Sequence, residues 1–81
     1  MERFGEKLHK LRTAHKMTLK ELAITLGYTS HSHLSELEAG KKTPTVEFVI
    51  KVARIFKVTT DSLLMDEIDP EINLENGTIK Q

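Results

Sequence analysis

The sequence predicts an all-α domain of five short helices followed by a C-terminal tail. Two observations support this: apolar residues recur at helical spacing through most of the 81-residue chain, and a serine or threonine stands where several of these segments begin. There is no cysteine, so disulfides and thiolate metal ligands are excluded and an apolar core must hold the fold together. A chain of this length makes one domain.

The first helix is predicted over about residues 2–15. Phe4, Leu8 and Leu11 follow one another at intervals of four and three residues, which places them on one face of a helix. The other face is polar, so this helix is expected to lie at the surface with one side in the core.

The second and third helices are predicted on either side of a tight turn. Thr18 and Glu21 have the spacing of a capping box, in which each side chain accepts a hydrogen bond from the backbone N–H of the other. Gly27 is expected to end the second helix in a left-handed conformation. Ser30 is expected to cap a third helix over about residues 30–39, and Tyr28 to fill an apolar seat in the turn. The inward residues of the third helix are Leu34 and Leu37.

The fourth and fifth helices are predicted to begin at threonine caps. Thr45 follows the helix-breaking Pro44, and Thr59 precedes Asp61, whose charge favours a helix N-terminus. The apolar face of the fourth helix is expected to consist of Val46, Val49, Ile50, Ala53 and Phe56. In the fifth helix Leu63 and Leu64 are expected to point inward.

The tail has a different character from the helical part, so the chain is expected to divide into residues 1–65 and an acidic tail, residues 66–81. Asn76-Gly77 is a strong hairpin signal, and apolar residues flank it. The tail is therefore expected to form a β-hairpin or strand, or to contribute to dimerisation; the alternative is a frayed terminus.

The charge is divided between the two ends of the chain although its net value is zero. Residues 1–57 hold 11 Lys/Arg against 6 Asp/Glu, a balance of +5, and residues 58–81 hold one lysine against 6 acids, a balance of −5. A basic body with an acidic tail suggests a polyanion as partner. The alternative is that the charges only solvate the surface.

The region from Thr18 to Gly40 is the most informative about function. A second helix whose inner face needs only two leucines leaves its leading outer face short and polar, which suits insertion into a DNA major groove. The residues left to face outward are His31, Ser32, His33, Ser35 and Glu36.

In this region the chain resembles the helix-turn-helix of the phage lambda repressor and Cro family, also called the XRE family. The resemblance covers about residues 4–64. It rests on L-R-T-A-H-K-M-T at 11–18, E-L-A at 21–23, L-G at 26–27, L-S-E-L-E-A-G-K-K-T-P-T at 34–45 and F-K-V-T-T-D-S-L-L at 56–64. It implies a five-helix DNA-binding domain and a sequence-specific transcriptional regulator of double-stranded DNA. It further implies a homodimeric repressor that binds an inverted repeat through the helix at about 30–39.

The resemblance also implies the residues that contact DNA. The expected base-contacting residues are His31, Ser32, His33 and Glu36, whose side chains have donors or acceptors for base edges. For Glu36 the alternative is an ion pair with a nearby lysine. The expected backbone-contacting residues are Thr18, Thr29, Ser30, Ser35, Lys41, Lys42 and Thr43, with Arg12 and Lys16 as further candidates.

Two departures from the family pattern affect these assignments. Leu19 stands where a phosphate-contacting glutamine is common, so that contact is lost or Leu19 lies against a sugar or another subunit. The turn also has one residue more than the commonest version between Gly27 and Leu34, which could shift the base-contacting positions by one.

A homodimer is expected because one recognition helix reads too few base pairs for specificity. The expected interface lies on the fourth and fifth helices and the tail, where apolar residues exceed what a small core needs. The residues assigned to it are Val52, Phe56, Met65, Ile68 and Ile72, with Val46 beside them.

Other functions are less consistent with the sequence. One alternative is a protein-interaction module, such as an antitoxin that binds a partner protein as well as DNA. No phosphate-binding glycine loop and no catalytic arrangement of Ser, His and Asp is present, so an enzyme is not expected. His31 and His33 lie about 200° apart on a helix and cannot readily share one metal ion, so no metal and no cofactor is expected. No apolar run is long enough for a bilayer and no signal peptide precedes the domain, which predicts a cytoplasmic protein.

Overall fold

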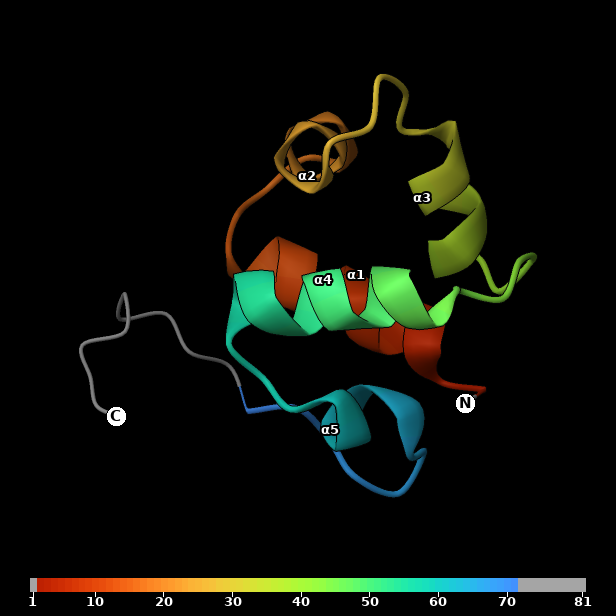
Figure 1. Cartoon of the computed structure of the whole chain (residues 1–81), viewed down its shortest axis with the longest axis vertical. Coiled ribbons are helices and arrows are strands. Elements are labelled where there is room, and N and C mark those ends of the chain that lie inside the picture. Colours follow the sequence, from red (N-terminus) through yellow and green to blue (C-terminus); the bar gives the residue numbers. More distant parts are fainter. Residues whose placement is uncertain (1, 72–81) are drawn as a thin grey trace.

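The computed structural model describes residues 2–71, and this part of the chain consists of five α-helices joined by short connections without a β-strand. The helices are α1 (Phe4–Ala14), α2 (Leu19–Leu26), α3 (Ser32–Glu38), α4 (Val46–Phe56) and α5 (Thr60–Leu64). Figure 1 shows α4 in front of α1, α2 above them, α3 at one side and α5 below. The prediction of five helices is confirmed. The predicted hairpin at Asn76-Gly77 lies outside the described residues.

Three threonines cap helices as predicted. The Thr18 hydroxyl accepts a hydrogen bond from the Glu21 N–H at 3.0 Å, and the Glu21 carboxylate accepts one from the Thr18 N–H at 2.8 Å, which completes the capping box. Thr45 and Thr59 each accept a hydrogen bond at 3.1 Å from a backbone N–H three residues further on. These caps define the starts of α2, α4 and α5.

The start of α3 differs from the prediction. Ser30 does not cap the helix: α3 begins at Ser32, and His31 occupies the N-cap position without a side-chain cap bond. The Ser30 hydroxyl instead accepts a hydrogen bond from the Ser32 N–H at 3.2 Å, which closes a local turn. The helix therefore starts later than its polar residues suggest.

All five helices contribute to one apolar core. Its buried members are Phe4, Leu8, Leu11, Leu22, Ala23, Leu26, Leu34, Leu37, Phe48, Val49, Val52, Ala53, Phe56 and Leu63. The buried face of α4 differs in part from the predicted one. It includes Phe48 and Val52, which were not expected in it, whereas Val46 and Ile50, which were, are exposed. Leu64, which was expected to point inward, is also exposed. The helix packs on α1 and α5 through residues four apart, starting at Phe48, and this leaves the first turn of α4 outside.

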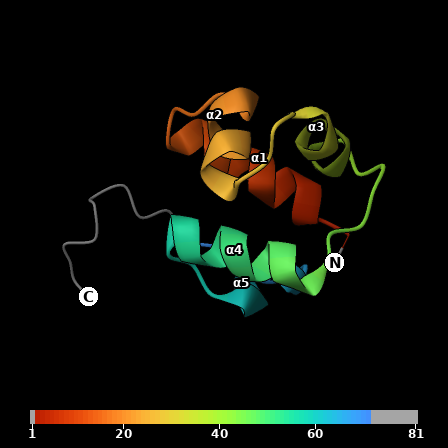
Figure 2. The same ribbon diagram turned by 45° about the horizontal axis from the view of Figure 1, so that its top comes forward.

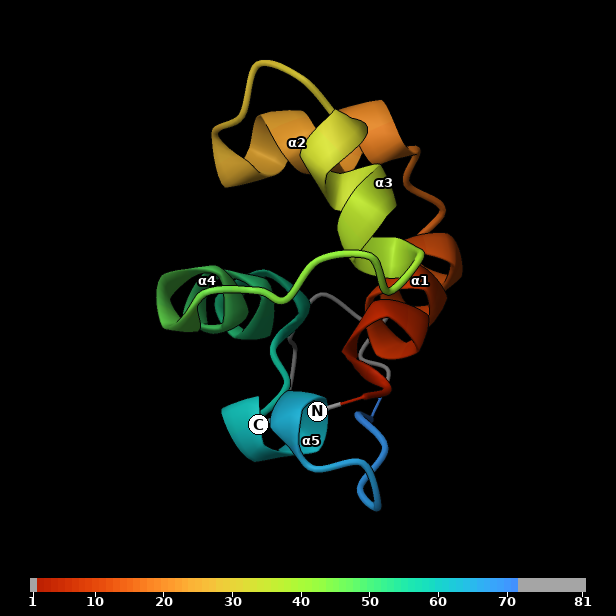
Figure 3. The same ribbon diagram turned by 90° about the vertical axis from the view of Figure 1, so that its right-hand side faces the viewer.

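A buried lysine connects the two ends of the described chain. Lys7 in α1 is 1% exposed, and its ammonium group donates hydrogen bonds to the carbonyl oxygens of Ser62 (2.7 Å), Met65 (2.6 Å) and Ile68 (2.6 Å). Three acceptors match the three donors of an ammonium group, so the buried charge is fully hydrogen-bonded. Figure 3 shows the result, with α5 beside the N-terminal end of α1.

The acidic residues after α5 strengthen this connection. The Asp66 carboxylate accepts hydrogen bonds from the backbone N–H groups of Arg3 (3.0 Å) and Glu2 (3.2 Å), and the Arg3 guanidinium binds Asp69. Residues 66–69 thus lie against the start of α1.

No helix within residues 2–71 has the length and apolar character needed to cross a bilayer.

Candidate nucleic-acid interface

Helices α2 and α3 form a helix-turn-helix at one side of the molecule. Gly27 ends α2 with φ +91°, and the Tyr28 N–H then donates to the Ala23 carbonyl at 2.8 Å, so the chain reverses as predicted. Figure 2 shows α2 and α3 on the same side of α1, away from α5. In Figure 3, α3 and the segment after it face the viewer. One side of α3 is therefore open.

The inner side of α3 is held by two leucines and by the side-chain carboxylate of Glu38, the last residue of the helix. Leu34 and Leu37 are buried. The Glu38 carboxylate accepts hydrogen bonds from the Arg12 Nε at 2.7 Å and Nη2 at 3.2 Å, and the exposed His9 ring lies 3.0 Å from it. The inner side thus has both an apolar anchor and an ionic one.

Arg12, a further candidate for a phosphate contact, binds other residues of the domain instead of standing free. Its side chain is only 12% exposed, and besides Glu38 it binds the Met17 carbonyl at 2.8 Å, just before α2. Arg12 therefore joins α1, α3 and the entry to α2, and each of its three guanidinium nitrogens donates a hydrogen bond within the domain.

The outer side of α3 carries most of the predicted base-contacting residues. His31, Ser32 and Ser35 are exposed, and the Glu36 side chain is 46% exposed. Glu36 also forms the alternative contact: its carboxylate lies 3.4 Å from the Lys42 ammonium. Glu36 is therefore paired with Lys42 and exposed at the same time.

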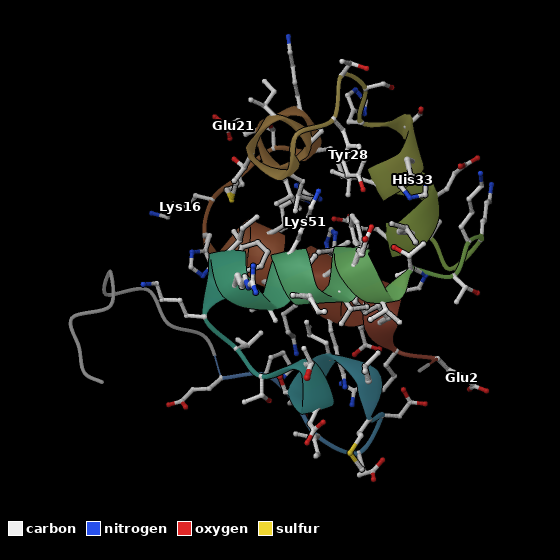
Figure 4. The ribbon with its side chains drawn as sticks, in the orientation of Figure 1. Glu2, Lys16, Glu21, Tyr28, His33 and Lys51 are labelled. Carbon is white, nitrogen blue, oxygen red and sulfur yellow. The ribbon has the colours of Figure 1, made fainter. Side chains whose placement is uncertain are left out.

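His33 differs from the other predicted base-contacting residues. Its ring is half-buried, with its centroid 5.9 Å from that of Tyr28 and 6.1 Å from that of Phe48. The expectation that His33 faces outward is wrong, because the residue directly before the buried Leu34 turns toward α4. Figure 4 shows Tyr28, His33 and Lys51 gathered between α2, α3 and α4.

Tyr28 fills the apolar seat expected of it. It is half-buried and stacks on Phe48 with ring centroids 6.2 Å apart, and the Lys51 ammonium lies 5.9 Å from its ring centroid. The rings of Tyr28, His33 and Phe48 thus pack the turn between α2 and α3 against α4. The sequence indicated Tyr28 but not its partners on α4, which lie twenty or more residues away.

The predicted backbone-contacting residues are all exposed, and most of them lie in connections. They are Thr18, Thr29, Ser30, Ser35, Lys41, Lys42 and Thr43. The Thr18 hydroxyl is already an acceptor in the capping box. Leu19, which replaces a common phosphate-contacting glutamine, packs against the core rather than standing free.

Two of the residues assigned to a dimer interface are in the core. Val52 is 0% exposed and Phe56 is 1% exposed, so neither can contact a second subunit. They lie on the buried face of α4, which the sequence pattern did not distinguish from its exposed face. Met65 and Ile68 are exposed, and Ile72 lies outside the described residues.

Within residues 2–71, no three His, Asp or Glu side chains come close enough together to hold a metal ion.

Comparison with known proteins agrees with this geometry. A family model described as helix-turn-helix matches residues 8–63. The chain is 32% identical over 78 residues to the uncharacterized HTH-type transcriptional regulator YobD of Bacillus subtilis, which covers 96% of this chain and 69% of that protein. It is 41% identical over 64 residues to the HTH-type transcriptional activator BcrR of Enterococcus faecalis, covering 79% of this chain but 31% of BcrR. It is 34% identical over 90 residues to the SPbeta prophage-derived uncharacterized HTH-type transcriptional regulator YonR of B. subtilis, covering 96% of this chain and 82% of that protein.

Proposed function

Because the chain belongs to the helix-turn-helix family of DNA-binding transcriptional regulators, we propose that it is a homodimeric repressor that reads an inverted repeat through α3. The family and the similar proteins are regulators and not enzymes. The observation that carries the proposal is the asymmetry of α3, whose inner side is fixed by Leu34, Leu37 and Glu38 while its outer side is polar and open.

Base reading is assigned to three residues of the outer side. His31 and Ser32 lie at the leading end of α3, where they reach base edges first, and each offers a donor or an acceptor. Glu36 lies one turn further along and can accept a hydrogen bond from the cytosine amino group. His33 is left out of this set because it packs on Tyr28 and Phe48.

Phosphate contacts are assigned to the connections on either side of α3. Lys41, Lys42 and Thr43 follow the helix, and Thr29 and Ser30 precede it, with exposed side chains in both places. Each lysine that neutralises a phosphate releases counterions, which adds affinity for any sequence and makes binding sensitive to salt. These residues orient the domain, and α3 supplies the sequence preference.

Two copies are needed for specificity. One short helix contacts only a few base pairs, whereas a two-fold pair of domains places two recognition helices in successive major grooves about 34 Å apart. A domain bound in this way over a promoter would exclude polymerase. Repression is therefore the mode of action that we propose.

The test is fluorescence anisotropy on a duplex taken from just upstream of the protein's own gene, with a scrambled duplex as control. At about 200 mM salt we expect a Kd near 10⁻⁸ M and at least about 10³-fold weaker binding to the control. The double variant His31→Ala/Ser32→Ala should lose the preference but keep scrambled-sequence binding. Lys10→Ala, on the exposed side of α1, is the matched control. Equal and salt-labile binding to both duplexes would overturn the proposal for this operator, and no binding to any duplex would overturn it altogether.

A further inference from the structure

The entry to α1 is held by a residue from the other end of the described chain. Arg3 occupies the N-cap position of α1, and its side chain forms no cap hydrogen bond. The Asp66 carboxylate instead accepts hydrogen bonds from the backbone N–H groups of Arg3 and Glu2. The Arg3 guanidinium in turn donates to the Asp66 carbonyl oxygen. The start of α1 is therefore fixed by a residue 63 positions further along the chain.

Lys7 brings Asp66 to this place. The Lys7 ammonium group lies one turn into α1 and binds the carbonyl oxygens of Met65 and Ile68, which stand on either side of Asp66 in the sequence. Figure 3 shows the segment after α5, in blue, beside the red start of α1. The segment is thus attached to α1 independently of the two bonds that the Asp66 carboxylate accepts.

The first turn of α1 packs against the C-terminal end of α3. A Cβ atom at Gly5 would lie 2.7 Å from the Glu38 carbonyl oxygen and would also press on that of Leu37, so the two backbones approach closely here. Figure 3 shows the end of α3 next to the start of α1. A change in the position of the first turn of α1 must therefore displace the end of α3.

The start of α1 also borders the connection that follows α3. A surface pocket of about 420 Å³ lies between the two, with Glu2 and Phe4 on one side and Lys42 and Thr43 on the other. Lys42 and Thr43 are among the residues assigned above to phosphate contacts. The entry to α1 and this part of the proposed DNA interface are therefore neighbours.

Phe4 extends the support to the other end of α3. It is 2% exposed, and its ring centroid lies 6.1 Å from that of Phe48 in an edge-on arrangement. Phe48 packs in turn on Tyr28 in the turn before α3 and on His33 near the start of the helix. Two consecutive residues of α1, Phe4 and Gly5, thus support α3 at both of its ends.

We propose that Asp66 is a positioning residue for DNA binding. By fixing the entry to α1, it holds the first turn of that helix in place, and through this turn it holds α3 and the connection after it in the orientation that meets the phosphates. This role depends on the DNA-binding function proposed above. The segment after α5 lies on the side of the domain away from α2 and α3 (Figure 1), so a partner that displaced it would weaken DNA binding from a distance.

The first test measures amide hydrogen exchange by NMR on the full chain without DNA. Asp66→Ala removes both acceptor oxygens, and we expect the Lys41 amide, which closes the end of α3, to exchange at least about tenfold faster. The Val58 amide closes the end of α4 by the same kind of bond and is the internal reference, since α4 ends far from the entry to α1. Glu67→Ala is the matched control, because it removes the same charge from the neighbouring exposed residue.

The second test measures binding to a scrambled duplex by fluorescence anisotropy at several salt concentrations, with circular dichroism to confirm that each variant is folded. The slope of log K against log salt reports the number of phosphate contacts, about 0.9 for each, and not the stability of the folded chain. We expect Asp66→Ala to flatten this slope by about 0.9 to 1.8, since one or two lysines lose their fixed place, and to raise the Kd severalfold. Glu67→Ala should keep the slope. Loss of an acidic residue by itself would lower the Kd, which is the opposite sign.

Asp66→Asn separates the hydrogen bond from the charge. The asparagine side chain keeps an acceptor oxygen for the Arg3 N–H and carries no charge. Asparagine serves about as well as aspartate beside a helix N-terminus. We therefore expect its salt slope and its Lys41 exchange to lie closer to wild type than those of Asp66→Ala.

Three outcomes would overturn the proposal: exchange at Lys41 that rises no more than exchange at Val58 in Asp66→Ala, a salt slope that stays at the wild-type value, or an Asp66→Asn variant as impaired as Asp66→Ala. The exchange measurement needs no DNA and so distinguishes this proposal from the proposed function. If wild type binds no duplex, the proposed function fails, whereas exchange at Lys41 still decides whether Asp66 positions the end of α3.

Discussion

Arg12 binds Glu38 through two hydrogen bonds and thereby joins α1 to the last residue of α3. The Nε–Oε2 distance is 2.7 Å, and the two side chains are 12% and 10% exposed. At this depth a carboxylate without its partner loses most of its hydration and gains nothing in return. The angle at which α3 projects from the domain therefore depends on this pair.

Removing either partner should destabilise the domain more than removing both. Arg12→Met leaves the Glu38 carboxylate with only the exposed His9 ring beside it and is expected to lower the free energy of unfolding by about 3 kcal/mol, while the double variant R12M/E38M regains part of that loss. Urea denaturation measures all three variants. Lys10→Met removes an exposed charge from the same helix and should change stability by less than about 0.5 kcal/mol. A single variant as mild as this control would disprove the role of the pair.

Lys7 should be essential for the order of α5. Lys7→Met removes the donor for three carbonyl oxygens, so we expect a loss of about 3 kcal/mol in unfolding free energy and faster amide exchange in α5. Hydrogen exchange followed by mass spectrometry measures this. Lys20→Met, on an exposed position of α2, is the control. Unchanged protection of α5 in Lys7→Met would contradict the expectation.

Gly5 should resist substitution by alanine, for a reason that propensity alone does not suggest. Alanine in a helix is normally more stable than glycine by about 1 kcal/mol. At position 5, however, a Cβ atom would stand 2.7 Å from the Glu38 carbonyl oxygen and press on that of Leu37. We expect Gly5→Ala to destabilise by about 2 kcal/mol, measured by thermal unfolding.

Gly27→Ala provides a comparison for that variant. Nothing lies within 4 Å of a Cβ atom at Gly27, and only the positive φ of +91° opposes a side chain, so a loss of about 1 kcal/mol is expected. A stabilising Gly5→Ala would contradict the close approach of the α1 backbone to the α3 backbone at this position.

Acid should release the segment after α5. Hydrogen bonds from the backbone N–H groups of Arg3 and Glu2 lower the pKa of the Asp66 carboxyl, and the Arg3 guanidinium lowers that of Asp69. A carboxylate whose pKa is lower in the folded chain stabilises it at every pH above the unfolded value, and this contribution disappears as the pH falls through the folded value. We expect stability to be level from neutral pH down to about pH 4 and to fall below it.

The double variant Asp66→Asn/Asp69→Asn tests this assignment by urea denaturation at several pH values. It should be less stable than wild type at neutral pH and should show a shallower fall in acid. Glu67→Gln is the matched control because its carboxylate is exposed and lies between the two aspartates. An acid profile of the double variant identical to that of wild type would show that other groups control acid unfolding.

Glu36 should restrain Lys42 in DNA binding. Glu36→Gln removes the ion pair and one negative charge from the outer side of α3, so affinity for a scrambled duplex should rise severalfold. Lys42→Ala should lower it and flatten the plot of log K against log salt by about 0.9. Lys41→Ala, next to it and without this carboxylate, should flatten the plot by a similar amount. Anisotropy titrations at several salt concentrations measure both effects, and an unchanged slope would remove these lysines from the interface.

Local signals in the sequence predicted the elements well. Threonine caps and apolar spacing are properties of neighbouring residues, so α1, α2, α4 and α5 begin close to where they were expected. The start of α3 was missed because Ser30, His31 and Ser32 follow one another, and no local signal selects which of them caps the helix. Ser30 is a good cap by type, yet His31 takes the N-cap position, and the Ser30 hydroxyl binds the N–H of Ser32, the first residue of α3.

Long-range contacts account for the other differences. The partners of Arg12 and Lys7 lie 26 and at least 55 residues away, and nothing in a stretch of sequence identifies such pairs. Val52 and Phe56 were assigned to an interface because an apolar residue on α4 can serve the core or a partner equally well. Only the position of α5 and α1 against α4 decides which side is covered.

The three carbonyl oxygens around Lys7 also have a consequence for the order of events during synthesis. The acceptors of the Lys7 ammonium group lie 55, 58 and 61 residues further along the chain. At about 5–20 residues per second, these acceptors leave the ribosome several seconds after Lys7 does. Until then α1 cannot bury this side chain, and the helices made in between lack their final support. Completion of the fold is thus delayed until the acidic segment has been translated, and a nascent chain stalled before residue 68 remains without its closing contact.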